Sequence, residues 1–267
     1  MYYSLNTSSD ICLLKPDMST ISMSNASIYD KFLVKYPLVS YSIVILYILF
    51  VKWIGPYIMR KRKPYSLQKV LIVYNLFQAL ANFYIFSNGI YFIRKYWDSR
   101  CVLRKTPIFD EVMEMSLKYG YDLYIIKFMD LLDTVFFVLR KKQNQVSFLH
   151  VFHHAGMCLL FSWSFKKLHL ILGFYVPIAL VLNTAVHVIM YTYYGLAAIG
   201  PQMQKYLWWK KHLTLLQIGQ LLFIIFYQIY GILTECEEFG KLEFYVLFYL
   251  SITVIFFLKF YRNYMNS

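Results

Sequence analysis

The stretch QVSFLHVFHHAGM, residues 145–157, carries three of the chain's six histidines, namely His150, His153 and His154. Their spacing of i, i+3 and i+4 brings all three imidazole rings to one face of a helix. The flanking residues are apolar, so the pattern predicts a helix that is buried in lipid or in a helix bundle. Protonatable, nucleophilic groups are costly to keep in such surroundings, and the cluster therefore indicates a functional site.

The composition of the whole chain agrees with a membrane setting for this helix. Of 267 residues, 59% are hydrophobic and 20% are aromatic, whereas soluble domains average about 45–50% apolar residues. The excess is gathered in long apolar runs, which is typical of integral membrane proteins. The net charge of +13 comes from short basic clusters between these runs, so we expect positive-inside topology and no nucleic-acid partner.

The apolar runs predict an all-α protein with seven transmembrane helices. The expected spans are residues 36–59, 67–93, 117–139, 147–165, 168–194, 213–230 and 244–260. Between them we expect a charged loop over residues 94–116, a tight turn at Lys166 and Lys167, and a short acidic loop before the last span. The predicted domains are a lumenal tail of residues 1–35, one transmembrane domain of residues 36–261 and a short cytosolic C-terminus of residues 262–267.

Charged and glycosylatable residues predict the orientation of these spans. The basic run from Arg60 to Lys63 follows the first span and places that end in the cytosol. The two N-x-S/T sequons, at Asn6 and Asn25, precede the first span, as expected for a lumenal tail. All fourteen acidic residues then lie in lumenal segments or in residues 117–139. The N-terminus is therefore expected in the lumen and the C-terminus in the cytosol.

In this topology Cys101 and Cys236 fall in two different lumenal loops. Because the lumen is an oxidising compartment, the two residues are a disulfide candidate. Two free thiols are the alternative, since the sequence does not fix the geometry that a disulfide requires.

The third span carries charges that are unusual inside a membrane. Lys127, Asp130 and Thr134 follow the spacing i, i+3 and i+7, and Asp133 lies beside them. An unpaired ionised side chain at mid-membrane costs several kcal/mol, so we expect Lys127 to pair with one of the two carboxylates. One explanation of such a pair is purely structural: it orients the helices and does nothing else. The alternative is a charged wall of a substrate chamber, which the surplus carboxylate favours.

The fifth and sixth spans add further polar groups on helical spacing. Asn183, His187, Tyr191 and Tyr194 lie on one face of the fifth span. A lone buried histidine is more often a core residue than a catalyst, but a three-histidine cluster in the same bundle favours a functional role. In the sixth span, one side presents Thr214, Gln217 and Gln220. Interhelical hydrogen bonding is the competing explanation for these three side chains.

Four of these segments, taken in order, resemble the signatures of the ELO-type very-long-chain fatty acid elongases. They are KFMDLLDT (127–134), LHVFHH (149–154), NTAVHVIMYTYY (183–194) and TLLQIGQ (214–220). The Val-Phe pair between the box histidines is similar to the HVFHH branch of the family. The chain departs from the family where Asp130 stands in place of the usual Glu, which puts the contacts of that side chain in doubt. The C-terminal dilysine signal of many members is also missing.

The resemblance implies a fold, a location and a reaction. The expected fold has helices 2–7 in a ring around a narrow acyl-chain tunnel, in the endoplasmic reticulum membrane. The expected reaction joins a long-chain acyl-CoA to malonyl-CoA and yields a 3-oxoacyl-CoA two carbons longer, CO2 and CoA. The expected partners are the lipid bilayer, both CoA thioesters, and the ketoacyl reductase, dehydratase and enoyl reductase of the elongation cycle, with a homodimer as a further possibility.

The resemblance also implies roles for individual residues. A desolvated neutral imidazole can attack a thioester and form an acyl-imidazole, and this role falls to His153, paired with His187. An enolate or oxyanion then needs nearby donors, a role that suits Asn183. The full catalytic set is His150, His153, His154, His187, Asn183, Lys127, Asp130 and Asp133. The substrate-binding set is Arg140, Lys141, Lys142, Tyr191, Tyr194, Lys210, Lys211, Thr214, Gln217 and Gln220. Its basic residues suit CoA phosphates, and ordinary positive-inside retention is the competing explanation for them. No metal and no cofactor other than the two substrates is expected.

Two other classes of protein share some of these features. A membrane di-iron desaturase or hydroxylase also carries an HxxHH box, but such sites resemble a scheme of about eight histidines, and this chain has six. A seven-span transporter or receptor would explain the buried charges of the third span. It gives no reason for the histidine triplet.

Overall fold

The computed structural model describes residue 28 and residues 30–101, 109–166, 174–236 and 241–265. Within these ranges every regular element is a helix. The helices are α2 (Phe32–Lys35), α3 (Pro37–Leu49), η2 (Phe50–Ile54), α4 (Gly55–Met59), α5 (Gln68–Tyr96), η3 (Trp97–Ser99), α6 (Phe109–Leu139), η5 (Gln143–Gln145), α7 (Phe148–Lys166), α8 (Tyr175–Ile199), η7 (Pro201–Tyr206), α9 (Lys210–Leu233) and α10 (Lys241–Met265).

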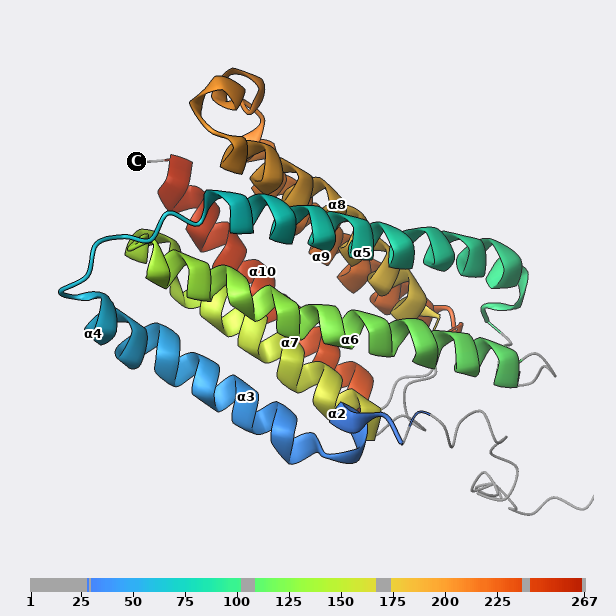
Figure 1. Ribbon diagram of the computed structural model, residues 1–267. Helices are drawn as coiled ribbons and strands as arrows, with labels where there is room; N and C mark the ends of the chain where they lie inside the picture. Colours follow the sequence, from blue (N-terminus) through green and yellow to red (C-terminus); the bar gives the residue numbers. More distant parts are fainter. Residues whose placement is uncertain (1–27, 29, 102–108, 167–173, 237–240, 266–267) are drawn as a thin grey trace, which may run out of the picture.

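Six of the long helices contact one another in a closed cycle. Helix α5 packs against α8, α8 against α9, and α9 against α10. Helix α10 packs against α7, α7 against α6, and α6 back against α5. Figure 1 shows these helices running roughly along one common direction, with α3 and α4 at the edge of the bundle beside α7 and α6. Several of the polar residues that the sequence singled out are buried among these helices, among them Lys127, Asp130, His154 and His187.

The first span is one continuous helical rod with a change of winding in its middle. The segment η2 has π-helical hydrogen bonding and leads directly into Gly55 and Pro56. Proline has no backbone N–H, so the regular α-helical ladder cannot continue through Pro56, and a π segment is a common accommodation of such a break. Together α3, η2 and α4 cover residues 37–59, which agrees with the predicted first span.

Five helices in the described ranges are long and apolar enough to cross a membrane: Pro37–Met59, Gln68–Ser99, Tyr175–Ile199, Lys210–Leu233 and Glu243–Asn263. Helices α6 and α7 fall outside this set because they carry the buried charges and the histidines. Large apolar side chains cover the outer faces, among them Leu38 (75% exposed), Val73 (68%) and Phe226 (65%). An outer surface of this kind is typical of a bundle surrounded by lipid. The predicted integral membrane, all-α class therefore agrees with the structure.

The predicted loop over residues 94–116 is wrong at both ends. Helix α5 continues to Tyr96 and a 3-10 turn to Ser99, while α6 begins at Phe109. Lys95 and Glu111 form an ion pair of 2.7 Å between the two helix ends. Hydropathy marks where an apolar run stops, but charged residues can extend a helix beyond that point into water.

The fifth span ends later than its prediction of residues 168–194, whose first residues lie outside the described part of the chain. Its described helix α8 begins at Tyr175 and ends at Ile199, before Gly200 with a φ of 129°. A glycine accepts this left-handed backbone without strain and so ends the helix. Lys166 is the last residue of α7 and not part of a turn. Lys167 and the sequons at Asn6 and Asn25 lie outside the described residues.

Candidate functional site

The histidine helix begins where the sequence predicts. Ser147 precedes α7, and its hydroxyl accepts a hydrogen bond of 3.1 Å from the backbone N–H of His150. A serine in this position satisfies one of the free N–H groups of the first turn and stabilises the start of the helix. The ring centroids of His150 and His154 lie 4.2 Å apart, and those of His153 and His154 lie 5.8 Å apart. The three imidazoles therefore form one group, which we call the histidine cluster.

A second polar group, the carboxylate cluster, surrounds Asp130 on the neighbouring helix α6. The Lys127 ammonium lies 3.1 Å from Asp130 Oδ2, and both side chains are at least 96% buried, with exposures of 4% and 2%. Gln78 of α5 donates to Asp130 Oδ1 at 2.7 Å, and Tyr191 of α8 donates to the same oxygen at 2.9 Å. The buried charge pair is thus joined by two neutral donors from two other helices, as a buried ion pair requires.

Tyr191 connects Asp130 with Asp133. Its hydroxyl lies 2.9 Å from Asp130 Oδ1 and also 2.9 Å from Asp133 Oδ2. A phenol has one proton to donate, so the two carboxylates share a single donor. Tyr191 is fully buried. Its role as a substrate-binding residue stays a prediction, and in the structure its hydroxyl links the two carboxylates of the carboxylate cluster.

His187 lies at the border between the two clusters. Its Nδ1 is 3.7 Å from Asp130 Oδ2, and its ring centroid is 5.6 Å from that of Tyr191. The distance to Asp130 exceeds that of a hydrogen bond, and Nδ1 has no hydrogen-bond partner in the structure. Asp130 therefore reaches Lys127, Gln78 and Tyr191 but stops short of His187.

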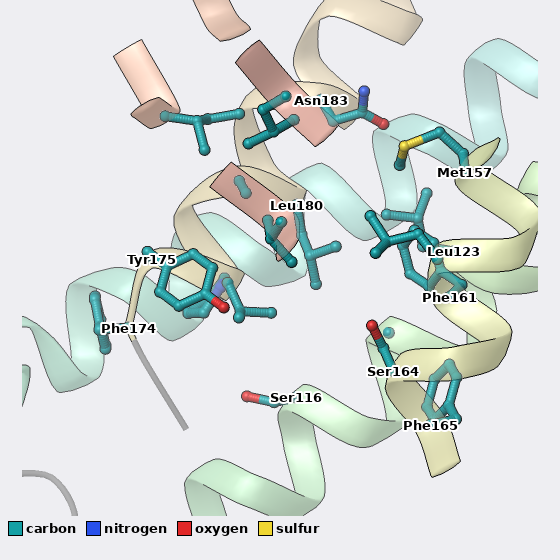
Figure 2. A pocket seen from close by; sticks show the side chains of 18 of the residues that line it. Ser116, Leu123, Met157, Phe161, Ser164, Phe165, Phe174, Tyr175, Leu180 and Asn183 are labelled. Carbon is teal, nitrogen blue, oxygen red and sulfur yellow. The ribbon is translucent and has the colours of Figure 1, made fainter. Parts of the chain in front are cut away.

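A cavity of about 190 Å³ lies between α6, α7, α8, α9 and α10 (Figure 2). Its proximal end carries His153, Asn183 and Gln220, and its wall from there onward is almost entirely apolar. The distal end reaches Ser164 and Phe165 at the far end of α7 and Phe174 at the start of α8. Along α7, the helical rise from His153 to Ser164 corresponds to about 16 Å. The cavity is thus long, apolar and polar at one end.

The structure brings together only part of the predicted site at this cavity. His153, Asn183 and Gln220 line it. The remaining predicted catalytic residues are not part of its wall and lie in or beside the two clusters: His150, His154, His187, Lys127, Asp130 and Asp133. Gln217 donates to Met190 Sδ at 3.4 Å, which fits the helix-bonding explanation. Thr214 does not line the cavity, and Tyr194 is 42% exposed.

Several polar atoms near the cavity are buried without a hydrogen-bond partner. They are His150 Nε2, His153 Nδ1, His187 Nδ1, Asn183 Oδ1 and Gln220 Oε1. Each buried, unpartnered polar atom costs about 1–3 kcal/mol. Atoms of this kind in a native protein call for an explanation, and a ligand that supplies their partners is one of the standard explanations.

Helix α10 fixes the position of His153 through a close approach to α7. The Tyr249 hydroxyl donates to the backbone carbonyl of His153 at 3.2 Å. A Cβ on Gly156 would lie 2.6 Å from the Tyr249 hydroxyl. Only a glycine leaves room for the tyrosine there, as small residues do where helices approach closely. Neither Tyr249 nor Gly156 was predicted as part of the site.

Sequence analysis also missed the contribution of α5. Gln78 is fully buried, and the Tyr74 hydroxyl accepts from Gln78 at 3.1 Å and donates to the Met129 carbonyl at 3.0 Å. A signal was present, because Asn75, Gln78 and Asn82 follow i, i+3 and i+7 and are at most 4% exposed. Three amides on one stripe of an apolar span indicate a face that points into the bundle.

The basic residues gather at the end of the bundle where α7 begins. The linker between α4 and α5 is tied to the end of α6, because Tyr65 N–H donates to the Leu139 carbonyl at 3.1 Å and Lys141 Nζ to the Arg60 carbonyl at 3.4 Å. The start of α5 is tied to the end of α8 by a 2.8 Å bond from Gln68 Nε2 to the Ile199 carbonyl. This end also carries the predicted binding residues Arg140, Lys141, Lys142, Lys210 and Lys211.

At the opposite end, a disulfide joins Cys101 to Cys236. It connects the segment after α5 and η3 to the segment after α9. The structure thus brings the two candidate cysteines together. Among the described residues, no three His, Cys, Asp or Glu side chains converge in a way that could hold a metal ion.

Comparisons with known proteins agree with the motif analysis. The ELO sequence profile, described as the GNS1/SUR4 family, matches residues 32–267. The chain is 40% identical over 244 residues to very long chain fatty acid elongase 4 of Macaca mulatta, which covers 88% of this chain and 75% of the relative. It is 40% identical to elongase 7 of Rattus norvegicus over 88% of this chain and 84% of the relative. Elongase F of Drosophila melanogaster is 42% identical over 72% of this chain and 74% of the relative.

Proposed function

The chain belongs to the ELO (GNS1/SUR4) family and is a multi-pass membrane protein, and from this premise we propose that it is a fatty acid elongase that condenses a long-chain acyl-CoA with malonyl-CoA. The products are a 3-oxoacyl-CoA that is two carbons longer, CO2 and CoA. The relatives named above are very long chain fatty acid elongases, which supports an acyl substrate of that class.

One observation carries the proposal: the apolar cavity ends at His153, Asn183 and Gln220, and each of these residues has an unpartnered polar atom. An acyl chain is apolar along its length and carries its only reactive polar group, the thioester, at one end. The cavity has the same distribution of polarity. Acyl-chain burial would supply the apolar contacts. The thioester carbonyl, which only accepts hydrogen bonds, would meet the His153 imidazole and the amide N–H groups of Asn183 and Gln220 at the polar end.

In the first half-reaction, His153 attacks the thioester carbonyl of the acyl-CoA. The imidazole nitrogen forms a bond to the acyl carbon while the carbon–sulfur bond breaks, so CoA leaves as its thiolate and takes up a proton. The tetrahedral intermediate carries a negative oxygen that needs hydrogen-bond donors. The amide groups of Asn183 and Gln220 face the same cavity, and each amide offers two N–H donors.

In the second half-reaction, malonyl-CoA loses CO2 and its α-carbon attacks the acyl-imidazole. The electron pair of the broken carbon–carboxylate bond becomes the enolate, which then forms the new carbon–carbon bond and releases the imidazole of His153. His150, His154 and His187 would orient this imidazole and handle protons. The carboxylate cluster would hold α5, α6 and α8 in register around it. No metal and no cofactor beyond the two thioesters enters this scheme.

The proposal extends to the placement of the protein in the membrane. We place α6 and α7 across the bilayer with the five apolar helices, so that seven spans result and helices α5–α10 form a ring around an acyl tunnel. The basic end would face the cytosol, where Arg140, Lys142 and Lys211 suit CoA phosphates. The N-terminus and the disulfide would face the lumen of the endoplasmic reticulum. The reductases and the dehydratase of the elongation cycle would consume the product, and a homodimer is compatible with this arrangement.

The experiment that tests the proposal uses purified protein in detergent or nanodiscs with labelled malonyl-CoA and a panel of acyl-CoAs. We expect release of labelled CO2 together with a 3-oxo product, and we expect both to persist in the presence of a metal chelator. Absence of condensation with every acyl-CoA, by a folded protein, would overturn the proposal. Condensation that the chelator abolishes would overturn the metal-free scheme alone.

A further inference from the structure

A small side pocket of about 20 Å³ lies beside the main cavity, between α5, α6 and α8. Ile85, Gly89 and Phe92 of α5 form its outer wall, and Met115 and Val181 add apolar groups from α6 and α8. A cavity of this size has room for about one water-sized or methyl-sized group. Its lining is apolar apart from two hydroxyls, and one of them, that of Tyr119, already donates to Asn88 at 2.9 Å. An apolar lining favours an empty or hydrocarbon-filled space over a hydrated one.

Three residues belong to the walls of both spaces: Ser116, Pro177 and Leu180. They form the partition between the main cavity and the side pocket. Of the three, Leu180 has the largest flexible side chain, and Figure 2 shows it among the lining residues of the main cavity, between Tyr175 and Leu123. Ser116 is small, and the ring of Pro177 is fixed to its own backbone.

The outer wall of the side pocket leaves it little freedom to expand. Ile85 and Phe92 are 2% and 3% exposed. A Cβ on Gly89 would lie only 2.4 Å from Val181 Cγ2, so α5 and α8 approach each other very closely at this point. With these side chains in place, an acyl chain in the main cavity can reach the side pocket only through the partition, where Leu180 lies.

We infer that Leu180 is a specificity-determining residue, because it separates the acyl-binding cavity from this side pocket. It thereby limits the length of the acyl chains that the enzyme accepts, an inference that rests on the proposed function. Removal of the Leu180 side chain joins the two spaces, and the distal methylenes of an acyl chain gain a second path past Ser116. In such a variant the occupant of the side pocket is the hydrocarbon end of a fatty acyl chain, which turns aside from the axis of the main cavity.

The test compares product lengths made by the wild type, Leu180→Ala and Val181→Ala with labelled malonyl-CoA and saturated acyl-CoAs of increasing length. Leu180→Ala should extend the longest acyl-CoA used by at least one elongation cycle. Val181 lines the side pocket but not the main cavity, so Val181→Ala enlarges the pocket behind an intact partition and should leave product length unchanged. The double variant should extend the product beyond that of Leu180→Ala, because the opened pocket is then larger.

The outcomes separate the two proposals. If the wild type makes no 3-oxo product, the proposed function fails. If the wild type condenses and Leu180→Ala gives the same longest product, or if Val181→Ala shifts the product as far as Leu180→Ala, the partition is overturned while the function stands. Should Leu180→Ala fail to fold, Leu180→Val opens the partition less and decides the question. It should shift the longest substrate in the same direction, and an unchanged product would overturn the inference.

Discussion

The carboxylate cluster and the histidine cluster lie side by side in one bundle, and they differ in how their polar atoms are used. Both oxygens of Asp130 have partners from Lys127, Gln78 and Tyr191. In the histidine cluster and its border, by contrast, His150 Nε2, His153 Nδ1 and His187 Nδ1 have none. In the carboxylate cluster, the only buried polar side-chain atom without a hydrogen-bond partner is Gln78 Oε1.

This difference separates residues that hold the fold from residues that await a ligand. Fully partnered buried groups give rigidity and a unique arrangement of helices. Unpartnered groups cost stability of about 1–3 kcal/mol each, and such a cost persists at sites where a substrate later supplies the partner. The comparison predicts that changes in the histidine cluster abolish chemistry without unfolding the protein. Changes in the carboxylate cluster should first lower stability.

The largest expected effect is that of His153→Ala. Loss of the nucleophile should lower condensation by more than about a hundredfold. The unfolding temperature should change little, because the removed Nδ1 makes no hydrogen bond. Labelled CO2 release and thermal unfolding in detergent measure the two quantities on the same preparation.

The matched control is His212→Ala, since His212 is an exposed histidine in the first turn of α9 and is not part of the cavity. It should retain wild-type activity. If His153→Ala remained active, the nucleophile assignment would fail. If it unfolded, the division between the two clusters would fail.

The histidine helix could be predicted from the sequence almost to the residue. Its signal is local: three histidines on one helical face and Ser147 in the position of a cap define both the site and the start of α7. The sequence also showed that Asp130 stands where the resemblance leads one to expect Glu. It did not show which partners the shorter side chain reaches. That depends on where α5 and α8 place Gln78 and Tyr191, two residues that lie about 50 to 60 positions away in the sequence.

Other features depend on contacts between helices that no local pattern reports. The cavity wall combines five helices, so the sequence could not separate Asn183 and Gln220, which line it, from Thr214 and Gln217, which do not. In the sequence, Tyr249 looks like any other aromatic residue of an apolar span. Only its 3.2 Å hydrogen bond to the His153 carbonyl identifies its role. Helix ends at 96 and 109 were missed because charged residues extend both helices past their apolar runs.

An intermediate effect is expected from Asp130→Asn, which removes the charge that compensates Lys127. Breaking a buried ion pair on one side costs about 3–5 kcal/mol, so the free energy of unfolding should fall by that order. Asp133→Asn, on the same helix turn, should cost less, because Asp133 is not ion-paired with Lys127 in the structure and accepts from Tyr191. Thermal or denaturant unfolding of the two variants gives the comparison.

A second substitution sharpens this result. In Asp130→Asn combined with Lys127→Met, neither charge remains in the apolar interior, so most of the lost stability should return. An equal loss in the single and the double variant would mean that charge pairing is not what the carboxylate cluster contributes. Activity in the stabilised double variant would then report how far the chemistry depends on these charges.

The smallest expected effect is that of Tyr47→Phe, at the outer edge of the carboxylate cluster. The Tyr47 hydroxyl of α3 lies 2.7 Å from Thr134 Oγ1, and the pair is buried. A second bond joins the same two helices, because the hydroxyls of Ser40 and Tyr124 lie 2.8 Å apart. Together the two hydrogen bonds attach the first span to α6. Loss of one such bond should cost about 1 kcal/mol, less if the Thr134 hydroxyl turns to a backbone carbonyl of its own helix. The unfolding temperature should therefore fall by about 2–4 °C with condensation unchanged, since α3 lies outside the six-helix cycle. A loss of activity without a loss of stability would contradict this expectation. Tyr47 and Thr134 would then belong to the residues that support the chemistry, and the first span would be part of the catalytic machinery.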